Sequence, residues 1–288
     1  MGRLPSDKNF ALRNFIGYGN GGGPTMSFIN FEIDEHVALV TMNSPSTRNA
    51  LGTLEQYEAI ESVCRRISED RAIRAVVWTG AGRAFCAGGD IKLMRSRSLD
   101  PELEPIEDRY HYKEGIHRIP LALYYLEVPV IAAVNGAAIG AGLDLACMCD
   151  IRIAGQSATF AESFVSLGII PGDGGAFLLQ RLIGSAKAAE LTYTADTITA
   201  EEALACNLVS RVVPDEELIE QAMQLAKRIA RNPPHALRMS KRLLREAQHA
   251  RLETVLELSA SFQALAHSTL DHKERIDAAV NRLHPKRG

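Results

Sequence analysis

The chain has 288 residues, of which 46% are hydrophobic and 23% are charged, and its formal net charge is -3 at pH 7. This length allows one large domain with an appendage, and the nearly balanced charge argues against a protein that works mainly by binding nucleic acid. No apolar run is long enough to span a membrane, so we expect no membrane partner. The five cysteines, an odd number in mostly apolar surroundings, indicate the reducing cytoplasm.

Residues 1–26 differ in kind from the rest of the chain. They contain Gly21-Gly22-Gly23 within a stretch of linker composition, and Met26 offers an alternative start. Scattered basic residues are compatible with a transit peptide, but Asp7 and the missing apolar stripe argue against one. We therefore expect a disordered extension or a cloning remnant here.

Strands and helices alternate between residues 27 and 175. Alternating or continuous apolar residues predict strands over residues 31–42, 75–78, 129–134 and 151–154. Apolar residues at helical spacing predict helices that begin near residues 54, 91, 106 and 142. Thr53 and Gln56 form a capping box for the first of these helices, and the third is expected to run unbroken over residues 106–126.

From about residue 176 the sequence predicts almost only helix. Thr199 and Glu202 form a second capping box. Further helices are expected to begin at residues 215, 234 and 252. We therefore predict an α/β core over residues 27–198 and a helical C-terminal subdomain over residues 199–288.

Two segments repeat one plan, an apolar strand followed by a glycine turn and a new helix, at residues 75–92 and 130–147. Unpaired N–H groups at a helix N-terminus favour an oxygen that carries negative charge. Chemistry at a carbonyl group needs two such donors on one oxygen, and the fold supplies them if it brings Gly89 and Ala141 together. Asp144 would then stand close enough to move protons. The alternative is that both turns are only tight connections.

Other kinds of site have weaker support. Gly140 and Gly142 match the start of a dinucleotide-binding fingerprint, and Glu162 lies at about the distance of its ribose-binding acid, but Leu145 occupies the third glycine position. Cys147-Met148-Cys149 lacks the spacing of a zinc site and a second Cys/His pair, so we expect core residues and no metal.

Several separated motifs follow one another along the chain: Asn49-Ala50-Leu51, Phe85-Cys86-Ala87-Gly88-Gly89-Asp90-Ile91-Lys92, Pro129-Val130-Ile131-Ala132-Ala133-Val134-Asn135-Gly136, Gly140-Ala141-Gly142, Phe160-Ala161, and Pro171-Gly172 with Gly174-Gly175. With this set the chain closely resembles the crotonase superfamily, which contains the enoyl-CoA hydratases and isomerases, over about residues 28 to 285. The resemblance implies a spiral of repeated strand-strand-helix units. It also implies a C-terminal helical region that builds a homotrimer or a dimer of trimers.

The resemblance further implies an acyl thioester of coenzyme A as substrate, with no separate cofactor because coenzyme A is part of that substrate. Gly89 and Ala141 match the two positions whose N–H groups form the oxyanion hole of this family. The predicted contacts to the thioester are Arg48, Ala50, Ala87, Gly89, Asp90, Ile91, Lys92 and Phe164. For Arg48 a solvated surface arginine is the alternative.

The two glutamates that activate water in the family's hydratases are not both present. Asp144 matches the first, and Phe164, which cannot transfer a proton, matches the second. We therefore expect double-bond isomerisation or a variant hydration rather than two-glutamate hydration. Glu162 and Asp173 are the candidate second acids. Each acid also has a structural role open to it: a loop salt bridge for Glu162, a helix N-cap for Asp173, and a cap in the first turn of its own helix for Asp144.

The helix expected over residues 106–126 lines the acyl pocket in relatives, so His111, Tyr112 or His117 could contact the substrate there. A function of another class stays open: a non-catalytic protein that binds coenzyme A and kept the fold after losing the acid at position 164. A Rossmann-type dehydrogenase is a more distant third.

Overall fold

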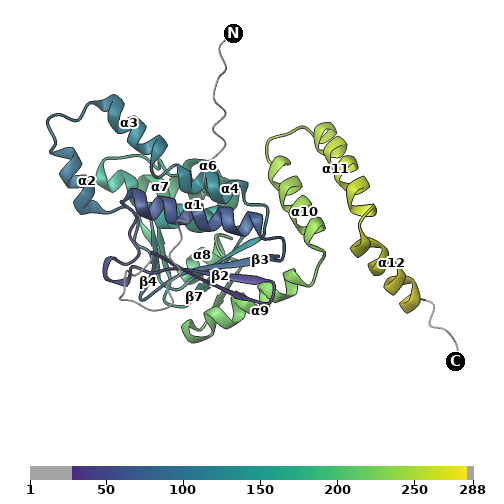
Figure 1. Ribbon diagram of the computed structural model, residues 1–288. Helices are drawn as coiled ribbons and strands as arrows, with labels where there is room; N and C mark the ends of the chain where they lie inside the picture. Colours follow the sequence, from purple (N-terminus) through teal and green to yellow (C-terminus); the bar gives the residue numbers. More distant parts are fainter. Residues whose placement is uncertain (1–27, 284–288) are drawn as a thin grey trace, which may run out of the picture.

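The computed structural model describes residues 28–283, so the extension expected over residues 1–26 lies outside the described residues. Two β-sheets form the centre of the molecule, and helices cover them from several sides (Figure 1). The last three helices, drawn in light green and yellow, lie to one side of this centre. No helix within the described residues combines the length and apolar character of a membrane span.

The larger sheet has six strands in the order β1-β2-β3-β5-β7-β10. Their bounds are β1 Ile29–Asp34, β2 Val37–Met42, β3 Ala75–Gly80, β5 Val130–Val134, β7 Ile151–Gly155 and β10 Arg211–Val213. Only β1 and β2 pair antiparallel, and the other neighbours are parallel. Parallel neighbours require crossover connections, which the helices provide.

The smaller sheet has four strands in the order β4-β6-β8-β9. Their bounds are β4 Ala84–Cys86, β6 Ala137–Ile139, β8 Thr159–Ala161 and β9 Thr197–Thr199. The chain visits the two sheets in turn, because β3 and β4, β5 and β6, and β7 and β8 each place one strand in the larger sheet and the next in the smaller. This arrangement confirms the predicted crotonase-like spiral of strand-strand-helix units.

The structure has twelve α-helices within the described residues, and short 3-10 turns join some of them. Their bounds are α1 Leu54–Glu69, α2 Ile91–Ser98, α3 Pro105–Glu114, α4 Arg118–Tyr125, α5 Ala141–Met148, α6 Gly175–Ile183, α7 Ser185–Thr194, α8 Ala200–Ala205, α9 Leu218–Ala230, α10 Pro234–Glu246, α11 Leu252–His267 and α12 Leu270–Leu283. Both predicted capping boxes, at the starts of α1 and α8, are present.

The larger sheet is buried on both faces. Successive residues of a strand point to opposite faces, so Val76 and Trp78 of β3 join the core on the side of α1 and α4, whereas Ala75 and Val77 pack against α9. This double burial explains why the strand is a continuous apolar run. Because β10 pairs with β7 and α9 covers the sheet, the core includes elements that follow the predicted boundary after residue 198.

Two elements differ from the sequence prediction. The single strand predicted over residues 31–42 is a hairpin, because Glu35 adopts a left-handed conformation with φ 55° and reverses the chain between β1 and β2. The single helix predicted over residues 106–126 is broken at Gly115 into α3 and α4. Pro120 explains the break, because proline fits only the first turn of a helix, so a new helix has to begin just before it.

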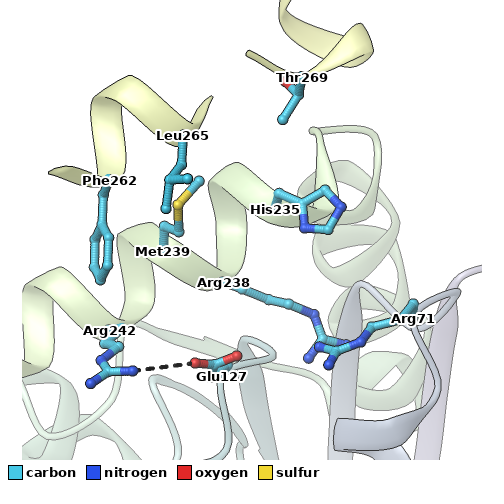
Figure 2. Close-up of a pocket in the computed structure, with 9 residues that line it drawn as sticks. All are labelled: Arg71, Glu127, His235, Arg238, Met239, Arg242, Phe262, Leu265 and Thr269. Carbon is cyan, nitrogen blue, oxygen red and sulfur yellow. Dashed lines mark ion pairs between the residues drawn. The ribbon is translucent and has the colours of Figure 1, made fainter. Parts of the chain in front are cut away.

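The C-terminal helices differ from the core in what they expose. Neither α11 nor α12 has a buried residue. Large apolar side chains of both helices are exposed to solvent, namely Leu252, Leu256, Leu265, Leu270, Ile276, Val280 and Leu283. A cavity of about 350 Å³ lies beside α10 and α11, lined by Met239 of α10, by Phe262 and Leu265 of α11, and by the guanidinium groups of Arg71 and Arg238 (Figure 2). Such an apolar surface is typical of a protein-protein contact.

Candidate active site

The two glycine corners that the sequence singles out lie against each other. The first is the turn after β4 with Gly88 and Gly89, and the second is the start of α5 with Ala141 and Gly142. A Cβ atom on Gly142 would collide with the carbonyl group of Cys86, so only glycine lets α5 approach β4 this closely. A Cβ atom on Gly88 would lie 3.8 Å from the nitrogen of Ala141. The fold thus brings the two corners together.

Each corner presents a backbone N–H group without a partner. In the parallel bridge beside Gly89, the N–H of Leu51 donates to the carbonyl oxygen of Gly88, and the N–H of Asp90 donates to the carbonyl oxygen of Leu51. The N–H of Gly89 itself has no hydrogen bond in the described part of the chain. Ala141 is the first residue of α5, where N–H groups have no helical carbonyl partner. Both positions predicted for an oxyanion hole therefore carry a free donor.

A cavity of about 410 Å³ opens beside the first corner, between α1, α2, α3 and the segment that precedes α6. Seven of the residues singled out in the sequence line it: Gly89, Asp90, Ile91, His111, Tyr112, Phe164 and Asp173. The others do not line it: Arg48, Ala50, Ala87, Lys92, His117, Ala141, Asp144 and Glu162. Arg48 and Lys92 are exposed on the surface, and the carboxylate of Asp90 caps α2 by accepting from the N–H groups of Lys92, at 2.8 Å, and Leu93.

Two carboxyl groups lie side by side behind the cavity wall. Asp144 and Glu162 are 0% and 1% exposed. The N–H of Gly175, at the start of α6, donates to Oδ2 of Asp144 at 2.9 Å. A Cβ atom on Gly175 would collide with both Oδ1 of Asp144 and Oε1 of Glu162, so these two oxygens face the same small space. Neither oxygen has a donor among the described residues, and a proton shared between the two groups supplies one.

The three carboxyl groups differ in how burial affects them. Burial, followed by the charges of Glu162 and Asp173, raises the pKa of Asp144 well above its usual range. Burial raises the pKa of Glu162 to about 7, against the opposing hydrogen bond with Asp144. Burial raises the pKa of Asp173 to about 6, while the positive charge of His117 acts in the opposite direction. Burial therefore favours the protonated form of Asp144, whereas Asp173, with a pKa of about 6, ionises below neutral pH.

Asp173 is the acid that faces the cavity. It lies in the turn before α6, is 5% exposed, and has an Oδ1 atom without a donor among the described residues. A hydrogen bond from His117, the N-cap of α4, holds this turn in place: Nε2 of His117 donates to the carbonyl oxygen of Gly172 at 2.9 Å. The N-cap of α6 is Gly174, so Asp173 does not cap that helix.

Neither a salt bridge of Glu162 nor a cap formed by Asp144 on its own helix matches the geometry. Glu162 forms no salt bridge within residues 28–283, and its carboxyl group points toward Asp144. Asp144 accepts from the N–H of Gly175 in α6 rather than capping its own helix. The side chain of Phe164 lines the cavity near Gly140, where a Cβ atom would lie 3.6 Å from the phenyl ring.

Two functionally placed residues were not recognised from the sequence. Tyr57 lies at an apolar position of the helix predicted to begin near residue 54, which indicates a core residue, yet it lines the cavity. The signal was a hydroxyl group at an otherwise apolar helical position. Asn49 is the first residue of the first family motif, and the sequence alone indicates no role for its side chain. In the structure this side chain holds β4. Its buried amide nitrogen donates to the carbonyl oxygens of Ala84, at 2.9 Å, and Phe85, which holds β4 in place before the first corner.

Comparison with known proteins places the chain. The sequence profile of the enoyl-CoA hydratase/isomerase family matches residues 32–287. The chain belongs to this family. It is 38% identical over 254 residues to the short-chain-enoyl-CoA hydratase of Clostridium acetobutylicum, a match that covers 87% of this chain and 94% of the relative. It is also 36% identical to the 1,2-epoxyphenylacetyl-CoA isomerase of Escherichia coli, covering 91% of this chain and 98% of the isomerase.

The solved structures agree with these relatives. The crystal structure of enoyl-CoA hydratase from Bacillus anthracis superimposes with a TM-score of 0.82 at 34% identity, covering 88% of this chain and 96% of that structure. The chain is therefore a crotonase-superfamily enzyme of the hydratase/isomerase type, the class that processes acyl-CoA thioesters.

Proposed function

We propose that the N–H groups of Gly89 and Ala141 bind the carbonyl oxygen of an acyl-CoA thioester and stabilise the enolate that forms from it. Support comes from the free N–H group at each corner and from the position of Ala141 at a helix N-terminus, where negative charge is favoured. One such donor in a dry site contributes about 2.7–4 kcal/mol to the stability of the transition state. Coenzyme A enters as part of the substrate, and no separate cofactor takes part.

The observation that carries the proposal is the placement of the two acids: Asp144 is enclosed beside Glu162, where burial favours its protonated form, whereas Asp173 lines the cavity. A reaction that adds water and a proton needs one group that gives a proton and one that takes a proton. Asp144, whose pKa is raised well above its usual range, is the acid. Asp173, whose pKa is about 6, is the base, and it takes over from the acid that Phe164 replaces.

Hydration of a 2-enoyl-CoA fits this division of roles. The carboxylate of Asp173 takes a proton from a water molecule while the water oxygen bonds to Cβ. The π electrons of the Cα–Cβ double bond move toward the thioester and form the enolate held by Gly89 and Ala141. Asp144 then gives its proton to Cα, and the product is a 3-hydroxyacyl-CoA. The reaction leaves Asp173 protonated and Asp144 ionised, so loss of a proton from Asp173 to solvent and return of a proton to the Asp144–Glu162 pair restore both groups for the next cycle.

Double-bond isomerisation is the second candidate, and Phe164 favours it, because a phenyl group in the place of an acid cannot activate water. In that reaction Asp144 removes a proton from C2 of a 3-enoyl-CoA and returns it at C4. This requires an ionised Asp144 at the start of the cycle. Burial favours the protonated form, so hydration has the stronger support.

The coenzyme A part of the substrate is proposed to lie along the first corner, in contact with Arg48, Ala50, Ala87, Gly89, Asp90, Ile91 and Lys92, while Phe164 contacts the acyl part. The N–H of Ala87 donates to the carbonyl oxygen of Arg48 at 3.0 Å, which joins the two segments that carry these residues. The exposed cations Arg48 and Lys92 suit the phosphate groups of coenzyme A.

The exposed apolar residues of α11 and α12 are proposed to form the contact of a homotrimer or of a dimer of trimers. The cavity beside α11 then becomes part of that contact (Figure 2). We also place the protein in the cytoplasm, because its five cysteines are free thiols, four of them buried.

Turnover of matched 2-enoyl-CoA and 3-enoyl-CoA thioesters tests the reaction. The expected result is formation of 3-hydroxyacyl-CoA from the 2-enoyl series. Conversion of the 3-enoyl series without hydration would establish isomerisation instead. Tight calorimetric binding of these thioesters with no turnover of any of them would contradict both reactions and indicate a protein that only binds coenzyme A.

A further inference from the structure

Two phenol groups share the cavity wall with Asp173. Tyr57 comes from the first turn of α1 and Tyr112 from α3, and both line the cavity together with the carboxyl group. Tyr57 is 5% exposed. Among the described residues, neither phenol has a hydrogen-bond partner, and Oδ1 of Asp173 lacks a donor as well. Three polar groups from three separate elements therefore meet with their hydrogen-bonding capacity unused.

The contacts of the two rings place them at this end of the cavity. A Cβ atom on Gly172 would lie 3.8 Å from Cε1 of Tyr112, so that ring lies against the residue next to Asp173. The ring of Tyr57 packs at the break between α3 and α4, where a Cβ atom on Gly115 would lie 3.2 Å from its Cε2. The helix break that the sequence did not predict is thus where Tyr57 finds room.

Both phenols are donors at neutral pH. Burial first, and then the charge of Asp173, raises the pKa of Tyr57 to about 12. The same two causes raise the pKa of Tyr112. Each phenol therefore keeps its proton and can donate it to an oxygen atom, while the carboxylate accepts.

The lining of this cavity includes the apolar residues Leu51, Ile116, Phe164 and Ile169, together with charged side chains such as Arg97 and Asp108. A hydroxyl group that loses its water when a ligand binds and gains no new partner is costly, so a ligand that supplies an oxygen atom here gains more than one that does not. In a mostly apolar cavity, a small number of polar groups usually fixes the orientation of the ligand.

We propose that Tyr57 and Tyr112 donate hydrogen bonds to the oxygen atom on Cβ of the acyl chain. This inference rests on the proposed function, because the oxygen is the water that Asp173 activates and then the 3-hydroxyl group of the product. The two phenols and Asp173 together replace the single acid that is missing at position 164. The preferred ligands are acyl-CoA thioesters with an oxygen substituent on Cβ, ahead of saturated chains of the same length.

Calorimetric binding of 3-oxobutyryl-CoA and butyryl-CoA tests this preference. Both thioesters are inert to hydration and dehydration, and they differ only by the oxygen on Cβ. We expect the wild-type protein to bind 3-oxobutyryl-CoA roughly tenfold more tightly, because each phenol contributes one net hydrogen bond. Tyr57→Phe and Tyr112→Phe should each reduce that ratio about threefold, and the double variant should abolish it without changing the affinity for butyryl-CoA.

Tyr110→Phe is the matched control, because Tyr110 is 43% exposed on the same helix as Tyr112 and does not line the cavity. It should keep the wild-type ratio. Equal affinity of the wild-type protein for the two thioesters, or an unchanged ratio in the double variant, would overturn the inference while leaving the proposed function standing. Binding of neither thioester would instead contradict the proposed function itself.

A kinetic measurement separates a direct contact from a structural role. In hydration of crotonyl-CoA, the double variant should have a lower kcat while its affinity for butyryl-CoA stays unchanged. A parallel loss of butyryl-CoA binding and of thermal stability would show that the phenols only pack the wall, which contradicts the inference.

Discussion

The acids behind the cavity wall and the acid on it lie in different surroundings and carry different charges. Asp144 and Glu162 are enclosed at the start of α6, where two carboxyl oxygens share one space. Asp173 reaches the cavity from the next turn, where the charge of His117 opposes the effect of burial on its pKa. Enclosure favours the protonated form of Asp144, whereas Asp173, with a pKa of about 6, ionises below neutral pH. The same carboxyl chemistry thus supplies an acid and a base within one site.

Asp144→Asn should have the largest effect on activity. The amide keeps an oxygen that can accept from the N–H of Gly175, but it cannot give a proton to Cα. We expect kcat/KM to fall by about 10²–10⁴, the usual contribution of a positioned general acid, with little change in thioester binding. Asp196→Asn, at an exposed carboxylate outside the cavity, is the control and should behave like the wild type. Full activity of Asp144→Asn on every acyl-CoA would show that its proposed role is wrong.

Asp173→Asn should distinguish the two acids by reaction. Loss of the base should lower hydration of 2-enoyl-CoA by about 10²-fold or more and leave any isomerisation of 3-enoyl-CoA in place. In the wild type, kcat/KM for hydration should rise with pH through about 6, where Asp173 loses its proton. A wild-type profile flat between pH 5 and 7, or one with the same limb in Asp173→Asn, would rule out Asp173 as the base.

The sequence predicts one side of this comparison better than the other. The two glycine corners and the position of Asp144 follow from apolar runs and from motifs that stay within a few residues of one another, and the spiral follows from the family resemblance that these motifs carry. The partner of Asp144 does not, because the direction of Glu162 depends on the 3-10 turn Ser163–Leu167 that begins directly after it. An extended segment and a helical turn place that side chain differently, and the local sequence is compatible with both.

The break between α3 and α4 has a similar origin. Helical spacing continues across residues 106–126, and the spacing alone predicts one helix. The break at Gly115 depends on Pro120 and on the ring of Tyr57, which belongs to a helix about sixty residues earlier. Contacts between distant segments decide these details, and for that reason the cavity wall with its phenols could not be predicted from neighbouring residues.

Glu162→Gln tests the shared proton through stability. Burial raises the pKa of Glu162 from 4.5 to about 7, so its contribution to folding is fully present below pH 4.5 and is lost as the pH rises through 7. The amide has no proton to lose, and it can donate to Oδ1 of Asp144. We expect the drop in unfolding free energy between pH 5 and pH 8 to shrink by about 3 kcal/mol in denaturant titrations. Glu216→Gln, at an exposed carboxylate, should keep the wild-type drop, and an equal drop in both variants would contradict a shared proton.

Gly175→Ala should have the smallest effect, because it changes only the space between the two acids. Its Cβ atom would collide with Oδ1 of Asp144 and Oε1 of Glu162, so the pair has to separate or the start of α6 has to move. Overpacking of this kind costs about 1–3 kcal/mol of stability. Gly172→Ala is the matched control, since its nearest neighbour would lie at an ordinary 3.7 Å, and it should unfold like the wild type. If Gly175→Ala keeps the wild-type unfolding free energy and its pH dependence, the raised pKa values of Asp144 and Glu162 do not depend on the close approach of the two carboxyl groups. The contrast with Asp173 then rests on burial alone.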